Sequence, residues 1–297
     1  MVGRVTQSSL VRGFIDHVQA LQRRSAEAQE QVRTQKRINA PSDDPGGAAR
    51  ATRLRSEDND LRALQETVGF GLSILGAQDA SLEEAEALLT RARELAVQHA
   101  NELVSPSERQ QSAIEVEEIE RELIRLANTR VAGRYIFGGL STGDAPFVAY
   151  DDPGFDPNTP YVGPADPFRV RTGRDGETTR LTTPGDDVFG EAILALDNLR
   201  QTLLAGTAPS AEIDEIATAA DGLRLERASV GARSRGLANR GEEILSSIGA
   251  TREAIGEIED IDLVEAIMDL QRLQSALEAT MLSGQTLQRS IVDYVRL

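Results

Sequence analysis

The residue types able to carry out chemistry are few in this sequence and lie far apart. The chain of 297 residues has no cysteine, which excludes disulfides, thiolate catalysis and cysteine metal sites. Its two histidines, His17 and His99, lie in separate helical stretches without the spacing of a zinc site. The sequence has no nucleophile elbow, phosphate-binding loop or dinucleotide-binding glycine motif. We therefore expect no enzymatic activity, no metal and no cofactor.

A group of aspartates in the middle of the chain is the remaining candidate for a ligand site. Asp151, Asp152, Asp156 and Asp166 lie among prolines and glycines, and oxygen-rich loops can bind Ca²⁺. Their spacing differs from that of an EF-hand loop, and aspartate commonly fills turns by bonding its own backbone. The turn interpretation is favoured, and an enzyme with a novel site in this region is the minor alternative.

The clearest pattern is a pair of apolar seams, one near each end of the chain. Their residues follow one another in steps of three and four, which places them along one side of a helix. The side chains of such a stripe become buried only when another helix packs against them. The N-terminal seam consists of Val11, Phe14, Val18, Leu21, Ser25, Ala28 and Val32, and the C-terminal seam of Ala266, Leu270, Leu273, Leu277, Thr280, Gly284, Leu287, Ile291 and Tyr294.

We expect these terminal seams to form a contact between subunits. Burying a large apolar side chain gains ~1.5–3 kcal/mol, whereas ordering the backbone costs ~1–2 kcal/mol per residue. An isolated pair of helices is therefore marginally stable, and neighbouring subunits would tip the balance. The predicted subunit-interface residues are Val11, Phe14, Val18, Leu21, Ala28, Val32, Leu270, Leu273, Leu277, Leu287, Ile291 and Tyr294.

A proline-rich turn interrupts the helical pattern after the N-terminal seam. Pro41 and Pro45 each disfavour helix at the residue before them. Ser42 or Asp44 can cap the next helix, and Pro45 suits its first turn. We predict a corner of the chain here. Its residues are Arg37, Asn39, Pro41, Asp43, Asp44, Pro45 and Gly46.

Two seven-residue repeats predict an inner bundle of long helices. Between them, Ser105, Pro106 and Glu108 form the pattern of a capping box, which predicts the start of a further helix. We expect this helix and the one before it to be antiparallel neighbours, because the break between them is short. The first repeat consists of Leu54, Leu61, Val68, Leu75, Leu82, Leu89 and Ala96, and the second of Ile216, Leu223, Val230, Leu237 and Ile244.

Glycine, proline and aspartate dominate residues 138–190, which predicts a small β-rich or irregular insert. Within it, residues 168–172 and 177–183 predict a hairpin around a turn at 173–176. The predicted fold class is mainly α: an elongated helical bundle built from both chain ends, with a small β-containing insert. We predict three domains: a terminal coiled-coil assembly domain of 1–44 with 258–297, a helical bundle of 45–137 with 191–257, and the variable insert 138–190.

Charge and hydropathy exclude several classes of partner. A formal net charge of −16 argues against binding nucleic acid or anionic membranes through a basic face. No apolar run approaches the ~20 residues that span a bilayer, which argues against membrane insertion. The first thirty residues lack the apolar core and cleavage site of a signal peptide. If the protein leaves the cell, we expect it to do so without a cleaved signal peptide.

Three segments resemble the flagellin superfamily. RINAPSDDPGGAARA at residues 37–51 resembles the corner after the first helix of that family, and its PSDDP form resembles hook-associated protein 3 more than filament flagellin. RYIFGG at residues 134–139, followed by Pro146 and Phe147, resembles the end of the third helix of the family. The C-terminal LQRLQSALEATMLSGQTLQRSIVDYV is also similar. The resemblance covers about the first 150 and the last 60 residues.

This resemblance implies a structural protein of the bacterial flagellum with a flagellin-like fold. It implies an extracellular adaptor at the hook–filament junction, exported through the flagellar type III channel and assembled as a ring. The implied partners are sister copies, hook-associated protein 1, filament flagellin and a flagellar export chaperone. Filament flagellin itself is one alternative. A cytosolic coiled-coil scaffold is another, because the acidic charge and the absence of cysteine suit it equally.

Overall fold

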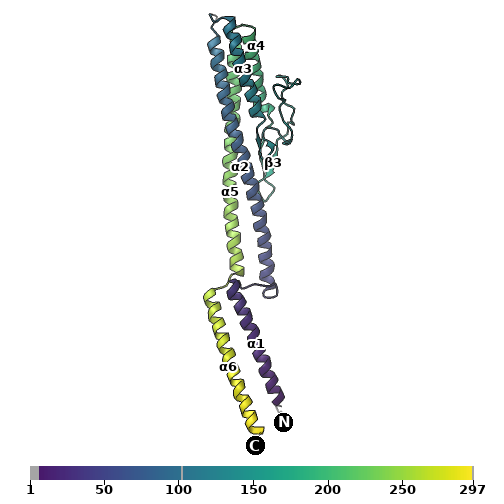
Figure 1. Cartoon of the computed structure of the whole chain (residues 1–297), viewed down its shortest axis with the longest axis vertical. Coiled ribbons are helices and arrows are strands. Elements are labelled where there is room, and N and C mark those ends of the chain that lie inside the picture. Colours follow the sequence, from purple (N-terminus) through teal and green to yellow (C-terminus); the bar gives the residue numbers. More distant parts are fainter. Residues whose placement is uncertain (1–6, 102, 296–297) are drawn as a thin grey trace. The chain divides into compact units, whose positions relative to one another are not determined.

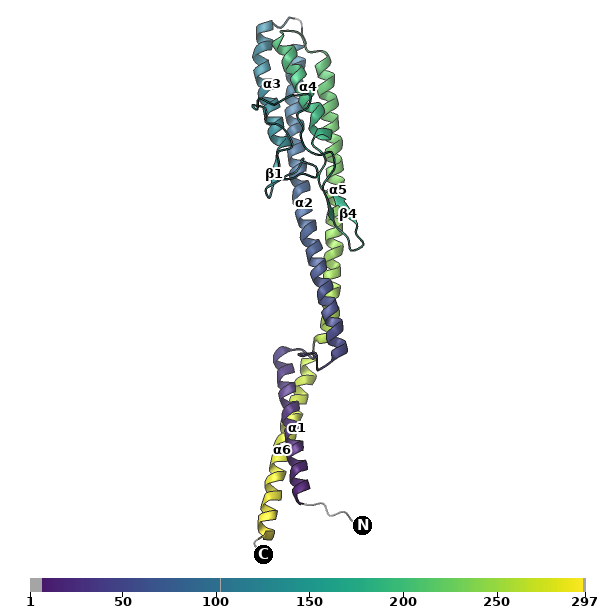
Figure 2. The same ribbon diagram turned by 90° about the vertical axis from the view of Figure 1, so that its right-hand side faces the viewer.

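The protein consists of two compact units that share two long helices (Figures 1 and 2). A computed structural model describes the backbone of residues 7–101 and 103–295 and the side chains of residues 12–101 and 103–285. Met1–Asp60 with Ser247–Leu297 form the terminal unit, and Leu61–Ser246 form the central unit. Helices α2 (Pro45–His99) and α5 (Ala211–Glu259) contribute to both units. The expected mainly α fold with a small β-containing insert is confirmed, whereas the three-domain division stays a prediction.

In the terminal unit, α1 (Gln7–Thr34) and α6 (Leu263–Val295) lie side by side (Figures 1 and 2). The pair is antiparallel, because Phe14 approaches Gly284 near one end while the carbonyl of Gln35 accepts a bond from the amide of Ile261 at the other (3.3 Å). Asp262 caps α6: its Oδ1 accepts from the amides two and three residues further on, at 2.9 and 3.2 Å.

In the central unit, α2 and α5 bury the predicted repeats, whereas Leu54, the first repeat residue of α2, lies in the terminal unit and is half-buried. Arg227 of α5 links the two helices, because its guanidinium pairs with Asp79 at 3.0 Å and with Glu83 at 2.9 Å on α2. The seven-residue periodicity therefore identified the core side of both helices correctly. The repeat residues that are 5% exposed or less are Leu61, Val68, Leu75, Leu82, Leu89, Ala96, Ile216, Leu223, Val230, Leu237 and Ile244.

Helices α3 (Pro106–Ala127) and α4 (Glu191–Leu204) pack against each other in the same unit. The predicted capping box is present: Ser105 Oγ accepts from the amide of Glu108 at 3.3 Å, and the Glu108 carboxylate accepts from the amide of Ser105 at 3.0 Å. Arg109 donates to the carbonyls of His99, Asn101 and Gly206 at 3.2, 2.9 and 2.8 Å. One guanidinium thus ties the turn before α3 to the turn after α4.

The insert is mostly irregular, with a short antiparallel hairpin and a π-helical turn, η1 (Asp186–Gly190), and another short hairpin precedes it in the chain. Strands β1 (Arg130–Val131) and β2 (Arg134–Tyr135) form one hairpin; β3 (Arg169–Arg171) and β4 (Thr178–Arg180) form the other. The second hairpin confirms the predicted turn, although its strands are shorter than expected. Aromatic rings form the core of the insert: Phe189 lies 4.8 Å from Phe137 and 6.0 Å from Phe147, between ring centroids.

Candidate assembly surfaces

The two terminal seams lie where α1 and α6 face each other within one chain. Leu21, Ala28 and Ala266 are buried, at 8%, 9% and 7% exposure. Val11, Leu287, Ile291 and Tyr294 belong to these helices, but their side chains lie outside the described residues. The structure therefore brings those seam residues whose side chains it describes together inside the molecule. The half-buried members of the seams are Phe14, Val18, Val32, Leu270, Leu273, Leu277, Thr280 and Gly284.

Helix α6 has a second apolar face that sequence reasoning missed. Because a helix turns about 100° per residue, Val264, Met268 and Leu282 lie roughly opposite the C-terminal seam. Val264 and Leu282 are 67% and 62% exposed, so pairing with α1 does not cover this face. The four-residue step from Val264 to Met268 carried a signal for it. We call this the outer face of α6; Leu263, Ile267 and Met281, which are also exposed, lie between it and the seam.

The predicted corner is a tight, hydrogen-bonded turn between α1 and α2. The Asp43 carboxylate accepts from the amides of Ala40 and Asn39, at 2.8 and 3.0 Å, and these bonds hold its pKa below the ordinary value. Asp44 caps α2, because its Oδ1 accepts from the amide of Gly47 at 2.8 Å. This bond, followed by the nearby charge of Arg37, lowers the pKa of Asp44.

Glu259, at the end of α5, connects the corner to the rest of the terminal unit. Its carboxylate is 5% exposed and accepts from Lys36 Nζ at 3.1 Å and Arg55 Nη2 at 2.5 Å. Its backbone carbonyl accepts from the amide of Arg37 at 2.6 Å, and Arg37 Nη2 also reaches the carbonyl of Ile258 at 2.8 Å. Sequence reasoning missed Glu259, because nothing local distinguishes it from the other acids of α5.

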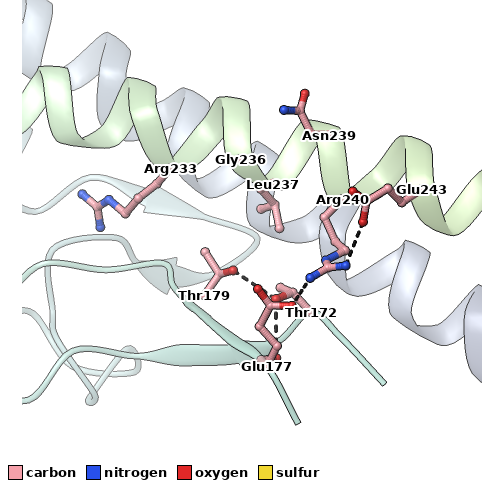
Figure 3. Close-up of a pocket in the computed structure, with 9 residues that line it drawn as sticks. All are labelled: Thr172, Glu177, Thr179, Arg233, Gly236, Leu237, Asn239, Arg240 and Glu243. Atoms are coloured by element: carbon pink, nitrogen blue, oxygen red, sulfur yellow. Dashed lines mark hydrogen bonds and ion pairs between the residues drawn. The ribbon is translucent and has the colours of Figure 1, made fainter. Parts of the chain in front are cut away.

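The hairpin of β3 and β4 lies against α5 and leaves an open groove of about 270 Å³ (Figure 3). The Glu177 carboxylate pairs with Arg240, and Arg240 Nη1 also pairs with Glu243 at 2.7 Å. Because two carboxylates already neutralise this guanidinium, the groove presents hydrogen-bonding groups rather than a free charge. It is lined by Thr172, Glu177, Thr179, Arg233, Gly236, Leu237, Asn239, Arg240 and Glu243.

A buried ionic cluster joins α3 to α4. Glu120 is fully buried and accepts from Arg200 Nε at 3.2 Å, while Arg200 also pairs with the buried Asp197. Two carboxylates therefore share one guanidinium, and Glu120 Oε1 has no hydrogen-bond partner among the described residues. Burial raises the pKa of Glu120 to about 7, with Arg200 opposing and Asp197 adding to the rise.

The structure arranges the histidines without catalytic geometry. Ser112 Oγ lies 2.7 Å from His99 Nε2, but His99 Nδ1 has no partner among the described residues, so no carboxylate orients the ring. Burial lowers the pKa of His99. Within the described ranges, no three or more histidine, aspartate or glutamate side chains are grouped so as to hold a metal ion. None of the helices there is long and apolar enough to cross a bilayer.

Comparison with known proteins places the N-terminal helices in a defined family region. Residues 15–142 match the model of the bacterial flagellin N-terminal helical region. Flagellin of Listeria monocytogenes is 34% identical over 103 residues, 35% of this chain and 36% of that protein. Flagellin A of Vibrio cholerae is 34% identical over 119 residues, 40% of this chain and 31% of that protein. The chain thus spans about a third of the length of the curated relatives it matches.

Solved structures resemble a larger part of the chain. FlgL of Bacillus cereus superposes with a TM-score of 0.59 at 22% identity, over 69% of this chain and 99% of that one. A putative flagellar hook-associated protein of Vibrio parahaemolyticus gives 0.63 at 18% identity, over 73% and 100%. Flagellar hook-associated protein 3 of Legionella pneumophila gives 0.60 at 14% identity, over 70% and 99%. The resemblance predicted from the sequence is confirmed: residues 15–142 match the model of the flagellin N-terminal helical region, and the chain shares the fold of these hook-associated structures.

Proposed function

We propose that this chain is a structural adaptor of the bacterial flagellum that joins hook to filament by assembling as a ring through its terminal helices. The fold it shares with hook-associated structures supports this role, as does the PSDDP form of its corner. We assign it no enzymatic activity. Its place is the extracellular hook–filament junction, which it reaches through the flagellar export channel without a cleaved signal peptide.

The observation that carries the proposal is the apolar surface that α6 keeps after it has paired with α1. Met268 and Leu282 of the outer face are 46% and 62% exposed, on a helix whose other side is already covered. Exposed apolar side chains rimmed by polar residues mark an interaction surface, and here Gln271, Ser275 and Glu278 lie between Met268 and Leu282 on the same side of the helix. The inter-subunit surface we propose therefore combines the predicted seam residues, which hold α1 and α6 together, with the outer face of α6.

The partners we propose are sister copies, hook-associated protein 1, filament flagellin and a flagellar export chaperone. An export chaperone would cover the outer face of α6 before assembly, and sister copies would cover it afterwards. Because the chaperone covers this face before assembly, the monomer would stay soluble during export. Neither nucleic acid nor membrane insertion forms part of the proposed function.

Aspartate substitutions would test the two faces of α6 separately. Leu277→Asp places a charge in the seam and is expected to separate α1 from α6, abolishing ring assembly and chaperone binding while the central unit stays folded. Met268→Asp charges the outer face and is expected to block assembly with the α1–α6 pair intact. Leu225→Asp is the matched control, because Leu225 is 75% exposed on α5. Normal incorporation of both α6 variants, measured by pull-down from isolated flagella, would contradict the proposal.

Filament flagellin is the second candidate, since the curated relatives carry that name. The location of the protein separates the candidates. Because the chain has no cysteine, Asp175→Cys in the exposed hairpin turn provides a unique site for a maleimide dye. The adaptor predicts a single spot at the base of each filament. Label along the whole filament would indicate flagellin, and label confined to the cytosol would indicate a scaffold.

A further inference from the structure

The hairpin of β3 and β4 differs in charge from the rest of the chain. Residues 169–180 contain four arginines against two acidic residues, whereas the whole chain has a formal net charge of −16. A positive segment on a strongly acidic molecule is a local feature of the surface rather than a consequence of composition.

The register of the hairpin places three of these arginines on one face. Arg169 is paired in register with Arg180, and Arg171 with Thr178. Because side chains alternate along a strand, Arg169, Arg171 and Arg180 share a face opposite that of Thr179. We call this the arginine face. Thr179 lines the groove against α5, so Arg169 and Arg171 are on the other side of the hairpin, whereas Arg180 is close enough to Arg233 of α5 for its charge to help lower the pKa of that arginine.

The arginine face has no acidic partner within the part of the chain that the structure describes. Arg169 and Arg171 are exposed and Arg180 is half-buried, and no carboxylate forms an ion pair or hydrogen bond with any of the three. Like charges directly opposite each other on a ladder are destabilising. Arg169 and Arg180 therefore carry a cost that no carboxylate among the described residues offsets.

The hairpin is held firmly enough to present this face. The Glu177–Arg240 ion pair fixes its turn to α5, and the hydroxyls of Thr172 and Thr179 lie 3.0 Å apart (Figure 3). The amide of Thr172 also donates to the carbonyl of Glu177 at 2.8 Å, which closes the turn. The three guanidinium groups are thus anchored to the central unit rather than to a loose loop.

We propose that the arginine face docks onto an acidic surface of a second copy of this chain. The inference rests on the proposed self-assembly. Copies that each carry a net charge of −16 repel one another, and a ring must bring them together. A contact between a positive face on one copy and an acidic surface on the next replaces repulsion with attraction at the interface. Because the two surfaces differ, the contact is head-to-tail and can repeat around a closed ring.

Charge reversal tests the docking. The double variant Arg169→Glu/Arg171→Glu changes two exposed side chains, and circular dichroism would verify that it folds. We expect its incorporation into flagella to fall at least about tenfold, because facing like charges across an interface are strongly unfavourable. The matched control is Arg93→Glu/Arg235→Glu, which makes the same charge change at exposed positions on α2 and α5. Equal incorporation of the two double variants would overturn the inference.

A crosslink identifies the partner. With benzoylphenylalanine in place of Arg171 in assembled flagella, we expect a crosslink to an acidic segment of a second copy. A crosslink only to a different flagellar protein would overturn the inference while leaving the proposed function standing. Absence of the unmodified chain from flagella would overturn the proposed function and the inference with it.

Discussion

The ring of Phe14 on α1 lies over Gly284 on α6, with its Cζ 2.4 Å from the point that a β-carbon on Gly284 would occupy. No side chain fits in that space without displacing the ring. Glycine at position 284 therefore allows the two terminal helices to approach closely, and this seam position receives the ring of Phe14, the largest side chain of the N-terminal seam.

Replacing Gly284 with isoleucine should destabilise the α1–α6 pair by about 1–3 kcal/mol, because the new side chain overpacks the contact with Phe14. Amide hydrogen exchange along α1 and α6 would measure the loss as faster exchange in both helices. In the double variant Gly284→Ile/Phe14→Ala part of the loss should return, since the ring that clashes is gone. Exchange as slow as in the unmodified chain would contradict this contact.

Gly13→Ala provides the matched control on α1. Nothing lies within 4 Å of a β-carbon at Gly13, so alanine there has room. Because alanine favours helix over glycine by about 1 kcal/mol, we expect slower exchange in α1 from this substitution. Opposite effects of the two glycine substitutions would separate steric overlap from helix propensity.

The features that the sequence predicted correctly are those set by neighbouring residues. The buried repeat of α2, the capping box at Ser105 and the hairpin turn at 173–176 each depend on residues a few positions apart. Periodicity also identified the seam sides of α1 and α6. It could not identify what covers them, because a stripe on a helix carries no information about whether its partner belongs to the same chain or to another.

The features that sequence reasoning missed depend on residues far apart in the chain. The partners Lys36 and Arg55 of Glu259 are 223 and 204 positions away. Glu120 and Arg200, which meet between α3 and α4, are 80 positions apart. Each of these side chains is ordinary in its local context. Only the packing of the helices makes the two glutamates buried and ionically paired.

Removing the Glu259 carboxylate should loosen the corner. Glu259→Ala leaves Lys36 and Arg55 without their shared acceptor, and both cations are about half exposed, at 44% and 50%, so water can partly replace it. We expect a loss of about 1–2 kcal/mol in the terminal unit, less than for a fully buried pair. Faster hydrogen exchange at the amide of Arg37 would report it. Glu257→Ala, at an exposed position on the same helix, is the control and should have no effect.

Removing the cap of α3 should destabilise the central unit. Ser105→Ala leaves the amide of Glu108 without its acceptor, while the backbone amide of residue 105 keeps its bond to the Glu108 carboxylate. Such losses cost about 1 kcal/mol. Urea unfolding followed by circular dichroism would measure the change. Ser107→Ala, in the first turn of the same helix, is the control; an equal loss there would show that the box itself contributes nothing.

Glu120 should make the stability of the central unit depend on pH. Its pKa is raised from 4.5 to about 7 by burial, so between these values the folded protein keeps a proton that the unfolded chain has released. The free energy of unfolding should therefore fall as pH rises from about 4.5 to 7 and level off above, by roughly 2–3 kcal/mol in total. Glu120→Gln should remove this part of the slope, because glutamine has no proton to lose.

The matched control is Glu118→Gln, at an exposed position on the same helix, which should retain the slope. Urea unfolding at a series of pH values would compare the three proteins, and identical slopes for the unmodified chain and Glu120→Gln would show that the buried carboxyl is not protonated in the folded state.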